Sequence, residues 1–142
     1  MTNKVLVVSL DKKFRRLERQ IKKTGTEILK ILKQKNAEVK IYLAGNAVMK
    51  SLNKKLRGKD KIANILSFEE PKKFISPELK FKKIGEIFLN VDNPSAGGDK
   101  NFSKEFLLIH GILHLLGYDH MKKSDAIKME VKEKLVSKKI KN

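Results

Sequence analysis

All three histidines of this 142-residue chain fall within the segment HGILHLLGYDH, which runs from His110 to His120. On a helix, His110 and His114 would leave the same face about one turn apart, because they are four residues apart. Gly117 can adopt a positive φ, end that helix and reverse the chain, which would bring His120 back toward the other two. Three imidazoles on a zinc ion leave a fourth position open for water or substrate. The segment therefore predicts a metal-dependent hydrolase.

An alternative explanation is that the histidines are hydrogen-bonded core residues. The third histidine and the turn glycine favour a metal site instead, since both fall where a closed ligand set needs them. The chain has no cysteine, so thiolate sites are excluded and the ligands must be imidazoles or carboxylates. We predict one Zn²⁺ per chain on His110, His114 and His120, although imidazoles also suit Ni²⁺, copper and iron.

The histidine spacing equals that of the metzincin zinc proteases, which carry a glutamate directly after the first histidine as general base. This chain has Gly111 at that position. A peptidase of that type would lack its proton acceptor. Zinc-dependent hydrolysis of a peptide or small amide stays an alternative function, but this departure argues against it.

Arg57 is the only arginine outside the segment 11–32, in a chain that otherwise prefers lysine. Its guanidinium could bind a scissile phosphate in bidentate fashion and stabilise the developing charge. The alternative is a surface arginine favoured by the dipole of a short helix. We predict Arg57 and His110 as catalytic residues, His110 through its role as a ligand.

Three further polar residues could support the site. Asp119, beside the third histidine, could accept a hydrogen bond from an imidazole or could simply stabilise a turn. Asn64 and Ser67 stand beside apolar strand positions and could contact substrate. The usual reason for polar residues at such positions is hydrogen bonding at turns and strand edges.

The formal net charge of +17 predicts a polyanionic partner such as nucleic acid. Lysine enrichment by compositional bias is the alternative, because only four of the 33 basic residues are arginine. Charge alone does not separate RNA from DNA or from an anionic membrane. No apolar run is long enough to cross a bilayer, and residues 5–10 are too short for a signal peptide. We therefore expect a cytoplasmic protein that is not membrane-bound.

Apolar periodicity predicts the elements that position these residues. The expected strands cover 5–10, 37–43, 62–68 and 84–91, and the expected helices cover 11–32, 46–55, 103–116 and a segment from about 124. Ile127, Val131 and Leu135 share one face of the last helix, which makes that face apolar. The fold class is α+β: one domain (1–142) with a small mixed four-stranded β-sheet and about four to five α-helices. The metal site would lie on a core helix and the turn after it.

The segment HGILHLLGYDH is very similar to the histidine signature of the YbeY endoribonucleases. LNKKLRGKDKIANILSF (52–68) and IGEIFLN (84–90) resemble two further motifs of that family, in the same order. The resemblance implies a cytoplasmic, single-strand-specific endoribonuclease with zinc on His110, His114 and His120 and with Arg57 in the active site. It also implies a role in ribosomal RNA maturation, at the 3′ end of the small-subunit rRNA, and in ribosome quality control. Single-stranded RNA and ribosomal proteins would be partners; we assume a monomer.

The chain departs from the family pattern at several positions, none of them a ligand. Leu56 stands where an aromatic residue is frequent, Ala63 lacks a threonine hydroxyl, and Glu86 replaces an aspartate. Phe106 occupies the place of a further histidine in many members. Any proton transfer by that histidine is therefore absent here.

These features predict metal-assisted cleavage of an RNA phosphodiester, with the nucleophile left open between water and the 2′-OH of the RNA. The third candidate function is a non-enzymatic ribosome-assembly factor with a structural ion. Structural zinc usually has four protein ligands, and the sequence offers no clear fourth.

Overall fold

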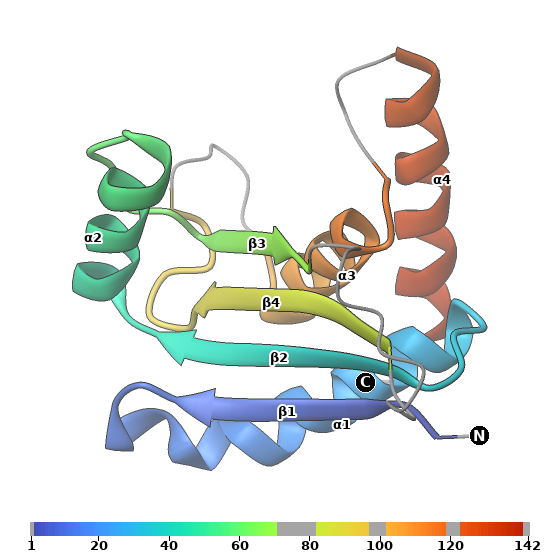
Figure 1. Cartoon of the computed structure of the whole chain (residues 1–142), viewed down its shortest axis with the longest axis horizontal. Helices are drawn as coiled ribbons and strands as arrows, with labels where there is room; N and C mark the ends of the chain where they lie inside the picture. The colour runs from blue at the N-terminus through green and yellow to red at the C-terminus, as the bar shows by residue number, and fades with distance from the viewer. Residues whose placement is uncertain (1, 71–81, 97–101, 119–122, 141–142) are drawn as a thin grey trace.

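The computed structural model describes residues 2–70, 82–96, 102–118 and 123–140. Their elements follow in the order β1 (Lys4–Ser9), the 3₁₀ helix η1 (Lys12–Leu17), α1 (Glu18–Ile31), β2 (Ala37–Ala44), α2 (Asn46–Arg57), β3 (Ile65–Glu69), β4 (Lys82–Asn90), α3 (Lys104–Leu115) and α4 (Lys123–Lys139). The α+β class and the small mixed sheet are confirmed (Figure 1). None of the helices in the described part of the chain is both long and apolar enough to span a membrane.

The sheet has the strand order β1-β2-β4-β3. β1, β2 and β4 are parallel, whereas β3 pairs antiparallel with β4 and occupies one edge. The central strand β2 carries Val39, Ile41 and Leu43 fully buried at alternate positions. That period of two turns these three side chains toward the same face of the sheet.

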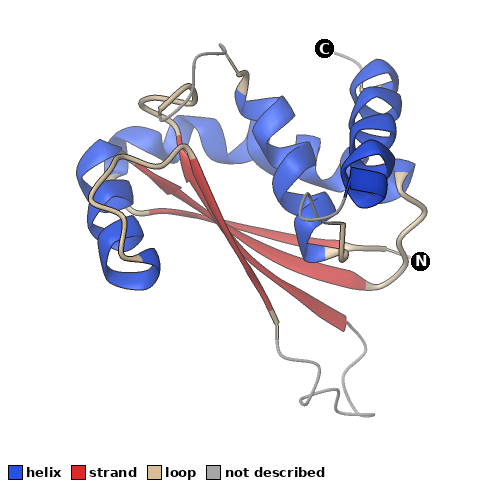
Figure 2. Cartoon of the chain, turned by 90° about the horizontal axis from the view of Figure 1, so that it is seen from above, coloured by secondary structure: helices blue, strands red, loops and turns tan. Residues whose placement is uncertain are grey.

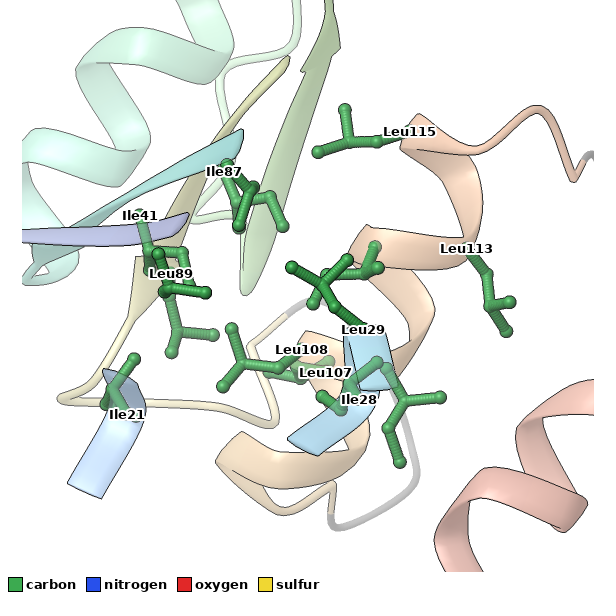
Figure 3. Close-up of a cluster of buried hydrophobic side chains, with 14 of the residues drawn as sticks. Ile21, Ile28, Leu29, Ile41, Ile87, Leu89, Leu107, Leu108, Leu113 and Leu115 are labelled. Carbon is green, nitrogen blue, oxygen red and sulfur yellow. The ribbon is translucent and has the colours of Figure 1, made fainter. Parts of the chain in front are cut away.

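The two faces of the sheet are covered differently (Figure 2). The main core joins α1 and α3 to one face, with Ile28, Ile41 and Leu108 fully buried among its members (Figure 3). On the other face, α2 packs Met49 against Leu66 in a smaller cluster. Neighbouring residues of β3 therefore face different helices, one facing α3 and the next facing α2. Candidate site residues on α3 and α2 accordingly lie on opposite faces of the sheet.

Capping interactions and a glycine set several helix boundaries. The Asp11 carboxylate accepts from the backbone N–H of Lys13, but the first turns are 3₁₀, so the expected single helix over 11–32 is divided into η1 and α1. Gly58, with φ at +69°, ends α2. The Ser103 hydroxyl accepts from the backbone N–H of Phe106 and begins α3, as its sequence predicts.

The buried face of α4 differs from the expected one. Ile127, Val131 and Leu135 remain 54%, 60% and 40% exposed, so this apolar face of α4 does not pack against the core. α4 buries Met129, Glu133 and Val136 instead. The helix carries two apolar stripes at helical spacing, and the buried one contains a carboxylate, which needs a partner. Such a partner exists on α3.

Candidate metal centre

α3 is the helix that carries the histidine pair, and it lies inside the main core. Leu107, Leu108, Ile112 and Leu113 are buried on it, as its nearly continuous apolar sequence predicts. A helix packed this way is rigid. Side chains that project from it keep a fixed position relative to the sheet.

Gly111 brings α3 close to β3 and β4. A Cβ atom at this position would stand 2.8 Å from Ile65 Cδ1 and 3.1 Å from both Ile87 Cδ1 and Ser67 Oγ. The space that a glutamate side chain would need is therefore filled by the sheet. This packing gives a physical reason why the chain has glycine where the metzincin proteases carry their general base.

His110 and His114 lie together on α3. Their ring centroids are 4.8 Å apart, and the ring planes meet at 71°. His110 Nδ1 lies 2.7 Å from Glu133 Oε2 of α4. An ionised carboxylate can only accept, so Nδ1 donates this hydrogen bond, and in the neutral imidazole the lone pair is then on Nε2. Two neighbouring imidazoles are nitrogen donors of the kind that zinc prefers.

The turn after α3 has the predicted geometry. Gly117 has φ at +100°, its N–H bonds to the His114 carbonyl at 3.0 Å, and the Tyr118 N–H bonds to the Leu113 carbonyl at 3.0 Å. This pair of bonds is a Schellman motif, which ends the helix and redirects the chain. The turn lies directly after His114, the second predicted ligand.

The predicted third ligand, His120, lies outside the described residues, as does Asp119. Within the described ranges, no three histidine, aspartate or glutamate side chains are grouped to hold a metal ion. Glu133 lies on the Nδ1 side of His110, so it supports that ring rather than completing the ligand set. Three-histidine coordination therefore remains a prediction.

Arg57 lies near the same edge strand but on the other face of the sheet. It is the exposed last residue of α2, with Cζ 5.9 Å from the ring centroid of Phe68. Phe68 and its neighbour Ser67 point to opposite faces of β3. Because Ser67 faces Gly111 on α3, Arg57 and the histidine helix approach β3 from opposite sides.

The remaining polar candidates lie along β3. Ser67 lies against α3 at Gly111, the residue that follows His110. The backbone carbonyl of Asn64 accepts from the N–H of Asn90 at 2.9 Å, directly before the β3–β4 ladder. This backbone hydrogen bond extends the pairing of the two strands. The structure therefore places Ser67 against α3 and Asn64 at the start of the pairing between β3 and β4.

Glu133 is the residue that the sequence interpretation missed. It follows Met129 by four residues and precedes Val136 by three, so the three share one helix face. Had the Met129 face been taken as the buried one, a carboxylate within it would have indicated a buried partner.

The comparison with protein families matches residues 5–141 to the family described as Endoribonuclease YbeY. This chain belongs to the YbeY endoribonuclease family. The YbeY endoribonuclease of Anaplasma phagocytophilum is 36% identical over 140 residues, which cover 91% of this chain and 88% of the relative. That of Persephonella marina is 34% identical over 117 residues, covering 79% and 71%. That of Bacillus subtilis is 33% identical over 112 residues, covering 71% of each.

A solved structure supports the fold. The solution structure of TM1509 from Thermotoga maritima superposes with a TM-score of 0.52, covering 93% of this chain and 85% of that one. The sequence identity is 23%, so this likeness concerns the arrangement of helices and strands alone. The YbeY family and its fold are thus supported by separate comparisons.

Proposed function

We propose that this chain is a zinc-dependent endoribonuclease that cleaves single-stranded RNA. We further propose that it acts in the cytoplasm on ribosomal RNA, at the 3′ end of the small-subunit rRNA, and in ribosome quality control, with ribosomal proteins as partners. The observation that carries the proposal is the His110–His114 pair on a buried helix, with Glu133 hydrogen-bonded to His110, in a chain of the YbeY family.

His110, His114 and His120 would hold the ion. When bound, zinc would supply a Lewis acid for a phosphoryl oxygen and would lower the pKa of a coordinated water. Ni²⁺ is a chemically reasonable substitute, because imidazole suits both metals.

Arg57 would bind the non-bridging phosphate oxygens. Its guanidinium is exposed and lies near the Phe68 ring of the edge strand β3, so an RNA strand in solvent could reach it. The histidine helix lies on the other face of that edge strand. An RNA strand passing across the edge would therefore meet the guanidinium on one side and the imidazoles on the other.

A cleavage assay with metal-free and zinc-reloaded protein tests the proposal. Zinc-reloaded wild type should cut a single-stranded RNA and leave its duplex form intact, and His114→Ala should abolish cutting. Arg57→Ala should reduce the rate by about 10²–10³, the usual loss when a transition-state donor is removed. Arg19→Ala is the matched control, since it also removes one exposed arginine. It should leave the rate within about twofold of wild type.

The outcomes separate the candidate functions. Equal cleavage with and without zinc would refute metal dependence, and wild-type cleavage by Arg57→Ala would refute the role of that arginine. Degradation of casein but not of RNA would indicate a peptidase. A 2′,3′-cyclic phosphate on the product would identify the RNA 2′-OH as nucleophile, whereas a 3′-hydroxyl and a 5′-phosphate would indicate water.

A further inference from the structure

We infer that Glu133 is a positioning residue for the metal centre, acting through His110. Its Oε2 atom lies 2.7 Å from His110 Nδ1, and its side chain is 11% exposed, against 26% for His110. The inference rests on the proposed zinc site, and it adds α4 to the elements that build that site.

The position of Glu133 is fixed by packing. Met129 and Val136 flank it on the same face of α4 and are fully buried. A carboxylate on such a face costs free energy unless it is paired. His110 is the partner that the described residues provide, so the buried face of α4 and the histidine helix are matched to each other.

The hydrogen bond has two chemical consequences. Because the ionised carboxylate accepts, it selects the His110 tautomer with the proton on Nδ1 and leaves Nε2 as the donor to a metal. It also fixes the rotation of the ring and increases the electron density that the ring can donate. Without Glu133, we expect the metal-free protein to populate the tautomer with the proton on Nε2 as well.

The test measures zinc affinity, by competition with a chromophoric chelator, in Glu133→Gln and Glu133→Ala. The control is Glu130→Gln, an exposed glutamate of the same helix that pairs with Lys134. We expect Glu133→Ala to weaken zinc binding by about 10- to 100-fold, the usual effect of losing such a partner. Glu133→Gln should lose less than Glu133→Ala but more than about twofold, because its amide oxygen still accepts but carries no charge, and Glu130→Gln should bind as wild type does.

Nitrogen-15 NMR of the metal-free proteins gives a second readout that a purely structural role would not move. The His110 ring should hold its proton on Nδ1 in wild type and should show both tautomers in Glu133→Ala. Should Glu133→Ala fail to fold, the nearly isosteric Glu133→Gln decides by its affinity. Zinc affinity within about twofold of wild type in the folded variants would overturn the inference, as would an unchanged tautomer.

These readouts separate this inference from the proposed function. Zinc binding that depends on Glu133, in a protein that cuts no RNA, would refute the endoribonuclease and keep the positioning role. Zinc-dependent RNA cleavage with unchanged affinity in Glu133→Gln and Glu133→Ala would do the opposite. A wild-type protein that binds no zinc would overturn both.

Discussion

Two glycines set the distance between α3 and the sheet. Gly111 does so from the helix, where Ile65 and Ile87 fill the space that a side chain would take. Gly85 does so from β4: it has φ at +146°, and a Cβ atom there would collide with the Phe68 carbonyl and with Leu115 of α3. Because these glycines let the backbone of α3 approach the sheet closely, they set the position of the histidines on α3 relative to the sheet.

Gly85→Ala should lower the free energy of unfolding by about 2–4 kcal/mol, because strain at positive φ adds to overpacking against backbone. Gly58→Ala is the matched control, since its φ is +69° and nothing lies within 4 Å of its Cβ position. That change should cost only about 1–2 kcal/mol. Urea denaturation measures both losses. Equal losses would show that the close contact at Gly85 adds nothing to the free-energy cost of the substitution.

At the residue scale, the sequence predicted what depends on local spacing. The His110–His114 pair and the turn at Gly117 both follow from distances along one helix. Glu133 could not be found this way, because its contact with His110 joins residues 23 positions apart on two helices. The placement of Arg57 across β3 likewise depends on the order of strands in the sheet, which spacing does not determine.

α4 shows that a helix can be predicted from its sequence while the face that it buries is not. Its start near Ser124 is confirmed within one residue, at Lys123. Its apolar residues, however, fall on two stripes, and local pattern cannot decide which stripe meets the core. The packing partner decides, because His110 on α3 stabilises the carboxylate that the Met129 stripe contains.

Met129→Ala should lower the free energy of unfolding by about 2–5 kcal/mol, because Met129 is fully buried and its truncation leaves a cavity. Val131→Ala should change it by less than about 0.5 kcal/mol, since Val131 is 60% exposed. Both values come from chemical denaturation monitored by circular dichroism. A larger loss for Val131→Ala than for Met129→Ala would mean that the other stripe of α4 is the buried one.

At the scale of the whole molecule, the charge of +17 attracts polyanions wherever they approach the surface. This attraction is independent of RNA sequence and would concentrate RNA near the proposed metal centre. Specificity must then come from the site itself, where Arg57 and the histidines lie on opposite faces of one edge strand.

Binding of a single-stranded RNA to the metal-free protein should weaken steeply with salt. Each phosphate that the protein neutralises contributes about −0.7 to the slope of log K against log salt. Arg57→Ala should make that slope shallower by about one such contact, and Arg19→Ala should be measured beside it as the charge-matched control. Fluorescence anisotropy at several salt concentrations measures the slopes. An affinity that does not change with salt would contradict an electrostatic role for the surface.

The most direct test of the whole account is X-ray absorption spectroscopy of the zinc-loaded protein. We expect three imidazole nitrogens and one non-protein oxygen at about 2.0–2.1 Å from the zinc ion in wild type. His120→Ala should show two imidazoles or retain no zinc. Four protein ligands in wild type, or an unchanged zinc environment in His120→Ala, would contradict the three-histidine centre with an open position.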